Sequence, residues 1–182
     1  MKLYLSKIKS PLGEILLATD EQERLRVLDF VDSGSSVSRV LRQHYGQCEF
    51  INATPLPKLL DCLERYFEGE YSAVNEIVTE APGNELQQQV WKALRDIPSG
   101  KTTSYGALAE ALGYRDPRMA ISVGAANASN PIAIVVPCHR VIAKNGELKG
   151  YAWGLHRKQW LLEHERALKA EKAPETARLP GF

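Results

Sequence analysis

The most informative segment of this chain is Ile132-Ala133-Ile134-Val135-Val136-Pro137-Cys138-His139-Arg140-Val141. Its apolar half needs buried surroundings, and burial raises the pKa of a thiol, whereas a basic neighbour lowers it. Cys138 is followed directly by His139 and Arg140. The pattern predicts either a buried cysteine supplied with the means to become a thiolate, or a structural core cysteine whose polar neighbours turn outward.

The composition is that of a globular protein of one domain or two small ones, with 182 residues of which 44% are hydrophobic. No apolar stretch approaches the roughly 20 residues that span a bilayer, so we expect no membrane partner. Residues 1–7 alternate between apolar and polar, which predicts a strand and not a signal peptide. Cys48, Cys62 and Cys138 are an odd, scattered set that suits free thiols in a reducing cytoplasm.

The two halves of the chain differ in charge. Residues 1–80 carry nine Lys and Arg against thirteen Asp and Glu, a net charge of −4, and residues 81–182 carry fourteen against nine, a net charge of +5. A basic C-terminal half is what phosphate contacts require, although a chance imbalance of surface charge remains an alternative.

The first 80 residues predict an α/β domain. Strand-like runs cover 3–9, 14–19 and 25–30, with turns between them, and helical periodicity covers 36–45 and 57–67. A further short strand is predicted at 76–79. The best domain boundary is residues 80–84, because Pro82 and Gly83 interrupt the pattern.

Residues 84–168 predict a second, mostly helical domain, followed by a loose tail at 169–182. Asn84 is the expected N-cap of a helix through residue 96, and Gly113 the expected C-cap of a helix over 105–112. Further helices are predicted at 118–127 and 159–168. The pair 105–112 and 118–127 has the proportions of a helix-turn-helix, and its second helix is rich in Ala, Ser and Gly. Such a smooth helix could approach the DNA minor groove closely, or it could pack tightly against another helix.

A wider motif surrounds Cys138. Downstream of it stand Asn145-Gly146, Gly150-Tyr151 and Lys158-Gln159-Trp160-Leu161-Leu162-Glu163-His164-Glu165, and upstream, more weakly, Ser10-Pro11-Leu12-Gly13. With Pro137–Val141 these segments resemble the active-site signature of the O6-alkylguanine-DNA alkyltransferases, also called methylated-DNA–protein-cysteine methyltransferases. The resemblance implies a ribonuclease-H-like N-terminal roll and single-turnover transfer of a methyl or alkyl group from O6 of guanine, and possibly O4 of thymine, in duplex DNA. It implies that Cys138 accepts this group.

The resemblance also assigns the catalytic roles. His139 would draw the proton from Cys138 through a water, and Glu165 would orient and stabilise His139. Asn130 would hold the cysteine loop. Tyr105 would donate to the purine ring, with Lys158 assisting the proton relay.

Further residues would form the substrate pocket. Carbonyls of Cys138 and Val141 would accept from the exocyclic amine, the amide of Ala152 would face O6, and Tyr151 would form a wall. Two positions depart from the common pattern: Ala133 stands where some members have proline, and Trp153 where several have glycine. Because Trp153 would narrow the site, we expect a preference for methyl over benzyl adducts.

The DNA-binding residues implied by the resemblance are Arg118, Ala120, Ile121, Ser122 and Arg140, the last also bracing the active-site loop. The family usually fills the gap left by the flipped base with an arginine, but Ile121 holds that position here. Either Ile121 is the wedge, or Arg118 one turn earlier reaches in, or flipping is impaired.

We expect no metal and no cofactor, because no Cys/His spacing suits zinc and no glycine-rich phosphate loop occurs. A monomer acting on alkylated double-stranded DNA is the simplest interpretation. A cysteine hydrolase and a non-enzymatic lesion-binding relative are the alternatives, and the presence of Cys138 argues against the second.

Overall fold

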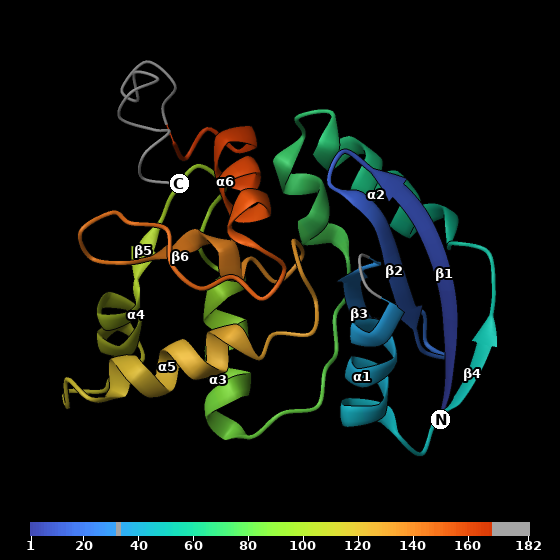
Figure 1. The fold of residues 1–182 in the computed structure, drawn as a ribbon, viewed down its shortest axis with the longest axis horizontal. Helices are drawn as coiled ribbons and strands as arrows, with labels where there is room; N and C mark the ends of the chain where they lie inside the picture. The colour runs from blue at the N-terminus through green and yellow to red at the C-terminus, as the bar shows by residue number, and fades with distance from the viewer. Residues whose placement is uncertain (32–33, 169–182) are drawn as a thin grey trace. The chain divides into compact units, whose positions relative to one another are not determined.

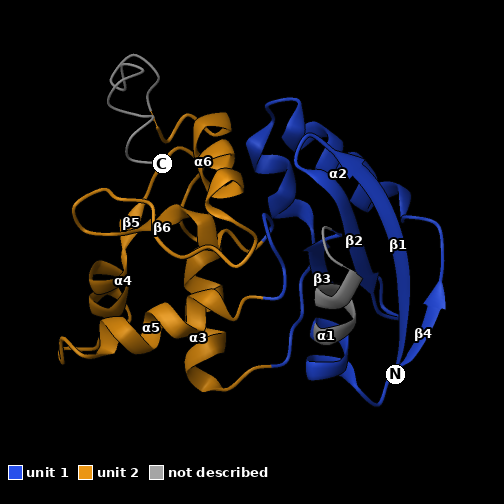
Figure 2. Cartoon of the chain, in the orientation of Figure 1, with its two compact units in different colours: residues 1–82, 131–135 blue, residues 83–130, 136–182 orange. Residues whose placement is uncertain are grey.

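The computed structural model describes residues 1–31 and 34–168, which form two compact units. Unit 1 contains residues 1–82 and 131–135, and unit 2 contains 83–130 and the chain from 136 onward (Figure 2). The chain therefore leaves unit 2 at Pro131 and returns to it at Val136, shortly before Cys138. Within the described ranges, no helix is both long and apolar enough to cross a membrane. The tail predicted at 169–182 lies outside the described residues.

Unit 1 is built on a four-stranded sheet of order β3-β2-β1-β4 (Figure 1). Its strands are β1 (Lys2–Ser10), β2 (Gly13–Thr19), β3 (Leu25–Phe30) and β4 (Glu49–Asn52). The first three are antiparallel neighbours and confirm the predicted strands, whereas β4 runs parallel to β1. The sequence did not predict β4, because this short edge strand is mostly exposed and carries no buried alternation.

Among its described residues, unit 1 also contains three helical segments. They are α1 (Gly34–Tyr45), α2 (Pro57–Phe67) and the 3₁₀ helix η1 (Tyr71–Glu76). Leu41 and Tyr45 of α1 join a buried cluster with Leu3, Leu16 and Val27 of the sheet. The helices predicted at 36–45 and 57–67 are confirmed as α1 and α2.

The strand predicted at 76–79 is wrong. Glu76 ends η1, and Thr79 forms an isolated bridge to Leu25. The amide of Leu25 donates to the Val78 carbonyl, and the amide of Glu80 donates to the Leu25 carbonyl. The segment is extended, but it touches β3 for too short a length to make a strand.

Residues 131–133 also pair with the edge of β3, beyond the bridge that Thr79 makes to Leu25. Leu28 donates to the carbonyl of Pro131 at 3.1 Å and accepts from the amide of Ala133 at 3.0 Å. An uncovered sheet edge exposes unpaired backbone groups, so this pairing stabilises the sheet. It also explains why a stretch inside the range expected for the C-terminal domain belongs to unit 1.

Two tight turns, around Ile134 and Pro137, precede Cys138. The amide of Val135 bonds the carbonyl of Ala133 at 2.7 Å around Ile134, whose φ is +69°, and such a γ-turn is strained for a β-branched residue. The amide of Cys138 bonds the carbonyl of Val136 at 2.8 Å around Pro137, in a relaxed inverse γ-turn with φ −83° and ψ 65°. The apolar run is therefore a bent, buried connection and not a strand.

Unit 2 is mostly helical. Its elements are α3 (Glu85–Arg95), β5 (Thr103–Ser104), α4 (Tyr105–Ala111), α5 (Met119–Ala128), the 3₁₀ helix η2 (Cys138–Arg140), β6 (Val141–Ile142) and α6 (Leu155–His164). The predicted cap at Asn84 is confirmed as a full capping box with Gln87. Gly113, just past α4, has a φ of +91°, the left-handed conformation expected of a glycine that ends a helix.

The helix predicted at 159–168 is displaced by four residues. It begins after Gly154, whose φ is +97°, and Glu165 is its C-cap. The start of this helix could not be read from apolar periodicity, because the charged residues Arg157 and Lys158 are buried while the apolar Leu155 is 43% exposed. Lys158 therefore lies within the helix and not ahead of it.

The small-residue helix α5 has two different faces. The indole nitrogen of Trp91 in α3 donates to the carbonyl of Ala126 at 2.9 Å, and Val123 is fully buried. Ile121 and Ser122 lie on the exposed face. One face of α5 thus packs within unit 2, and the other is open to solvent.

Candidate active site

Cys138 begins η2 and its side chain is 3% exposed. Two asparagines fix the loop around it: Asn130 donates to the carbonyl of Val136 at 2.8 Å, and Asn127 donates to the carbonyl of Cys138 at 3.4 Å. The amide of Val141 also donates to the Cys138 carbonyl. The thiol is therefore held by a rigid, hydrogen-bonded turn.

The residues that follow Cys138 form a buried cluster with the end of α6. His139 Nε2 lies 2.9 Å from Glu165 Oε1, and Arg140 reaches both carboxylate oxygens at 2.9 Å through Nε and Nη2. Arg140 Nη1 donates to the carbonyl of Ile97 as well. Gly100 has a φ of +82°, and a Cβ there would come within 3.3 Å of the Glu165 carbonyl, so glycine allows this loop to close on α6.

The cluster sets the protonation states of His139 and Glu165. Burial lowers the pKa of His139 below its ordinary value, even though Glu165 opposes this effect, so the imidazole is neutral at pH 7. Burial raises the pKa of Glu165, but the interactions with His139 and the permanent charge of Arg140 outweigh it and hold that pKa well below its usual range. With Nε2 donating to the carboxylate, the neutral imidazole presents Nδ1 as an acceptor.

The resting thiol is protonated. Burial raises the pKa of Cys138 to about 11, although a hydrogen bond from Asn130 and the charge of Lys158 act in the opposite direction. Burial also lowers the pKa of Lys158 to about 8, against the influence of Cys138. The thiolate expected from the sequence therefore has to be generated by a base, because burial outweighs the neighbouring charges.

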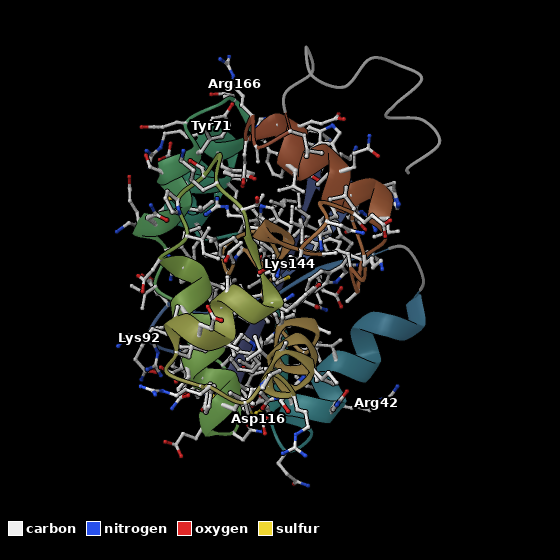
Figure 3. All side chains as sticks on the ribbon, turned by 90° about the vertical axis from the view of Figure 1, so that its left-hand side faces the viewer. Arg42, Tyr71, Lys92, Asp116, Lys144 and Arg166 are labelled. Atoms are coloured by element: carbon white, nitrogen blue, oxygen red, sulfur yellow. The ribbon has the colours of Figure 1, made fainter. Side chains whose placement is uncertain are left out.

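Lys158 closes the loop that follows β6, where Lys144 is labelled in Figure 3. Its ammonium donates to the carbonyl of Val141 at 2.7 Å and to that of Lys149 at 3.0 Å. The hydroxyl of Tyr105 donates to the same Lys149 carbonyl at 3.5 Å. Burial raises the pKa of Tyr105, with a further contribution from Cys138. Tyr105 therefore remains a hydrogen-bond donor at neutral pH.

Tyr151 and Trp153 stand beside this loop. Their rings meet edge to face with centroids 5.2 Å apart, and Arg157 donates to the carbonyl of Trp153 at 3.0 Å. The Tyr151 hydroxyl is buried without a hydrogen-bond partner among the described residues, and burial raises its pKa well above the ordinary value. Ala152 between them is exposed.

Comparison with known proteins places this geometry in a family. Residues 85–167 match the DNA-binding domain of 6-O-methylguanine DNA methyltransferases, and residues 3–80 match their ribonuclease-like domain. A methylated-DNA–protein-cysteine methyltransferase of Shigella flexneri is 46% identical over 91% of this chain and 96% of its own length. This chain belongs to the methylated-DNA–protein-cysteine methyltransferase family.

Solved structures of the family agree with the fold. A crystal structure of the Mycobacterium tuberculosis O6-methylguanine methyltransferase is 36% identical, covers 91% of this chain and 93% of its own, and superposes with a TM-score of 0.75. A structure of the OGT from the same organism in complex with DNA, also 36% identical, covers 90% and 93% and gives 0.73. The expected family, the ribonuclease-like N-terminal fold and the mostly helical C-terminal fold are confirmed.

The structure of this methyltransferase-family chain brings most of the expected residues together in unit 2. The hydrogen-bonded network just described contains Cys138, His139, Glu165, Asn130, Lys158, Tyr105 and Val141. Tyr151 makes no hydrogen bond in it, but the charge states of Cys138 and Glu165 influence its pKa. Ala133 lies in unit 1, where its amide bonds to β3, so its role in the pocket stays a prediction.

The residues expected to contact DNA differ in their exposure to solvent. Arg118 and Ile121 are exposed at the start of α5, Ser122 is exposed and Ala120 is half-buried. Arg140 is 4% exposed and engaged with Glu165 and Ile97. That geometry supports its bracing role and gives no support to a DNA contact.

Asn127 also contacts this site, although the sequence did not predict it. It lies on the buried face of α5 and donates to the backbone carbonyl of Cys138. The only sequence feature that distinguishes Asn127 is that it is a polar residue among the small residues of a helix, and this feature is too weak to predict a site residue without the fold.

In the described ranges no group of three or more His, Cys, Asp or Glu side chains is placed to hold a metal ion.

Proposed function

We propose that this chain repairs alkylated duplex DNA by moving a methyl or other alkyl group from O6 of guanine to Cys138, once per molecule. The observation that carries the proposal is the buried Cys138, with the imidazole of the next residue held 2.9 Å from Glu165. Family membership supports the reaction, and the related structure in complex with DNA supports the partner. The activity is that of a methylated-DNA–protein-cysteine S-methyltransferase.

The chemistry begins with removal of the thiol proton. Nδ1 of His139 is buried and has no hydrogen-bond partner among the described residues, and Nε2 is committed to Glu165. A water between Sγ and Nδ1 would pass the proton to the imidazole, and Glu165 would stabilise the imidazolium that forms.

The transfer is a displacement at the methyl carbon. The thiolate forms the S–C bond as the bond between that carbon and O6 breaks, and guanine leaves with its electron pair. A proton returns from His139 to the departing base, assisted by Lys158, while Tyr105 donates a hydrogen bond to a ring nitrogen. The product is a methyl thioether, which has no good leaving group, so Cys138 is consumed and each molecule reacts once.

The base has to leave the helical stack before Cys138 can reach it, at a cost of a few kcal/mol. The exposed face of α5 supports a close approach to the minor groove, and Ile121 is an apolar side chain that is 77% exposed there. Arg118 is held by Asp116 in the turn between α4 and α5 (Figure 3), with contacts of 2.8 to 3.1 Å. We therefore assign the wedge to Ile121, with Ala120 and Ser122 as backbone contacts to DNA.

Replacement of the wedge tests this assignment. Ile121→Ala should lower both duplex affinity and repair rate, with little effect on reaction with a free base. Val78→Ala, which trims a 62% exposed side chain of unit 1, is the matched control. Unchanged affinity and repair rate in the Ile121 variant would exclude Ile121 as the wedge.

Trp153 and Tyr151 together support a narrow pocket. The carbonyl of Val141 and the amide of Ala152 would bind the base, and the paired rings would limit the size of the adduct. We expect methyl groups on guanine, and possibly on O4 of thymine, to be transferred faster than benzyl groups. Comparable inactivation by free O6-benzylguanine and by methylated DNA would contradict this selectivity.

We further propose a monomer that acts in the cytoplasm, with residues 1–80 as a supporting domain and 84–168 as the DNA-binding and alkyl-transfer domain. The three free cysteines support a reducing compartment, where the acceptor thiol stays usable.

The deciding experiment is the intact mass of the protein after incubation with a duplex that contains one O6-methylguanine. A gain of one methyl group on Cys138, stoichiometric with the protein, is the expected result. Turnover of an ester or peptide without a stable adduct would instead favour a cysteine hydrolase.

A further inference from the structure

Unit 1 contains a cavity that the proposed reaction does not use. It has a volume of about 380 Å³, and its lining comes from residues 22–24, from the first part of α2 with its cap Leu56, and from residues 76–78. All of these segments belong to unit 1. The volume lies within the range of cavities that bind small organic molecules, and the chemistry of the lining determines which kind.

The deep part of the cavity is apolar. Leu59 and Ile77 are each 7% exposed, and Cys62 is fully buried, with burial raising the pKa of its thiol. Part of the rim is apolar as well, because Val78 is 62% exposed and Leu56 is half-buried. A ligand with an apolar body would cover this surface, and removal of apolar area from water is the main favourable contribution to binding.

The start of α2 presents unused hydrogen-bond donors beside this apolar surface. Pro57 occupies the first position of the helix and has no N–H group, and no side chain caps the helix. Among the described residues, the amides of Lys58 and Leu59 donate to no acceptor, and both residues line the cavity. Free amides at a helix N-terminus carry a partial positive charge, which favours an anionic group.

Lys58 adds a full positive charge at the same point. It is exposed and forms no ion pair with the described residues. Two other charged residues of the lining are already paired, Arg24 with Asp20 and Glu76 with Arg65. The ammonium of Lys58 is therefore available to a ligand in a way that the guanidinium of Arg24 is not.

Glu23 is the remaining charged residue of the lining. It lies in the turn that precedes β3, where its amide donates to the carbonyl of Asp20, and its carboxylate forms no ion pair with the described residues. A ligand that carried an ammonium group besides its carboxylate would use Glu23, whereas a simple carboxylate would not. Replacement of Glu23 therefore separates these two classes of ligand.

We infer that the cavity binds a small organic carboxylate with an apolar body, of the kind represented by a medium-chain fatty acid. The carboxylate accepts from the amides of Lys58 and Leu59 and pairs with the ammonium of Lys58. The apolar chain covers Val78 at the rim. A phosphate ion would satisfy the donors but leave the apolar surface exposed, and an amine would meet the positive end of α2. The inference goes beyond the proposed function, because it concerns unit 1 alone.

Octanoate tests the inference on the full chain. Backbone amide chemical shifts are followed as octanoate is added, and saturable changes that are largest at Lys58 and Leu59 are expected. Octylamine, with the same chain and the opposite charge, should bind about tenfold more weakly, because the helix end and one exposed ion pair together account for a factor of that order. Inorganic phosphate should cause no saturable change where octanoate saturates, because it lacks the apolar chain.

Substitutions at the rim separate the contributions. Lys58→Gln should weaken octanoate binding about fivefold through loss of the ion pair, and Lys9→Gln, at an exposed lysine of β1 outside the cavity, is the matched control. Val78→Asp should weaken binding at least as much, because it replaces apolar surface with a negative charge. Glu23→Gln should not weaken it. All four side chains are exposed, so the variants should keep the fold, which circular dichroism checks.

Shifts that do not saturate, or that are confined to unit 2, would overturn the inference, as would unchanged octanoate affinity in Lys58→Gln and Val78→Asp. Tighter binding of octylamine than of octanoate, or weaker octanoate binding in Glu23→Gln, would overturn the assignment of a simple carboxylate. Failure of the protein to take up a methyl group on Cys138 would overturn the proposed function and leave this inference standing. The two failures are therefore distinguishable.

Discussion

Cys138 of unit 2 and Cys62 of unit 1 are both buried thiols that lie beside an arginine–carboxylate cluster. Cys62 Sγ lies 3.8 Å from Glu76 Oε2 and accepts from Arg65 Nη2 at 3.6 Å. Burial raises the pKa of both thiols. At Cys62 the adjacent carboxylate raises the pKa further and pairs with Arg65, whereas at Cys138 the adjacent residue is a neutral imidazole with a free acceptor nitrogen.

The two clusters also differ in their exposure. Arg65 pairs with Asp61, Glu70 and Glu76 at the surface, with its side chain 28% and the Glu76 side chain 49% exposed. The side chains of His139 and Glu165 are fully buried and that of Arg140 is 4% exposed. Both thiols thus lie near charges, but only Cys138 lies beside a cluster whose imidazole and carboxylate are held out of contact with water.

The largest expected difference is between the two thiols themselves. Cys138→Ala should abolish uptake of the methyl group, because it removes the proposed acceptor, and Cys62→Ala should retain full stoichiometry. Intact mass after incubation with O6-methylguanine duplex measures both. Methylation at Cys62 in the unmodified protein would break the contrast.

The second-largest effect on repair should follow removal of the Glu165 charge. Glu165→Gln leaves the buried guanidinium of Arg140 without its counterion, and breaking a buried pair costs about 3–5 kcal/mol in the free energy of unfolding. The methyl-transfer rate should fall about 100-fold, because His139 loses the group that orients it and stabilises its charge. Urea unfolding and single-turnover kinetics give the two quantities.

The matched control is Glu76→Gln in the surface cluster of unit 1. Exposed pairs contribute about 0–1 kcal/mol, so its unfolding free energy should change within that range and its repair rate should not change. Equal losses in the two variants would show that burial is not what separates the clusters.

The repair rate should depend on the protonation of His139. Because His139 must be neutral to act as base and burial lowers its pKa, the rate should fall only in solution more acidic than the pKa of an ordinary histidine, about 6.5. A decline that begins near pH 7.5 would contradict the assigned state of His139.

Stability should fall in acid for a related reason. Both His139 and Glu165 have folded-state pKa values below their unfolded ones, so the unfolded chain binds more protons and stability rises with pH. The contribution of His139 is present above about pH 6.5 and that of Glu165 above about pH 4.5, and each is lost as the pH falls toward the folded-state value. Urea unfolding at several pH values measures this slope, and stability that is constant from pH 7 to pH 4 would exclude it.

The smallest effect is expected at Arg118, which belongs to the same unit as Glu165. Its side chain is 87% exposed and pairs with Asp116 at 2.8 Å. Arg118→Ala should change the unfolding free energy by less than about 1 kcal/mol. A larger loss of unfolding free energy would mean that the exposure of an arginine–carboxylate pair does not determine how much the pair contributes to stability.

Local signals in the sequence predicted much of the fold. Asn84 before an amphipathic run predicted a capping box, and Gly113 predicted a helix end, because both depend on neighbouring backbone groups. Strand β4 and the true limits of α6 were not predictable in this way. In β4 the residues are mostly exposed, and in α6 the charged residues Arg157 and Lys158 are buried and an apolar Leu155 is exposed.

The family could be recognised from the sequence, because residue type and spacing around Cys138 form its signature, and the same motif predicted that Cys138, His139 and Glu165 act together. Tertiary structure alone decided the rest: residues 131–135 join unit 1 through β3, Ile134 turns the chain in a strained conformation, and Arg140 points inward. It also brought Asn127 to the carbonyl of Cys138. Except for the local turn at Ile134, these outcomes depend on hydrogen bonds between separate segments of the chain, such as β3 with residues 131–133 and Arg140 with Glu165, and no local pattern of side chains encodes them.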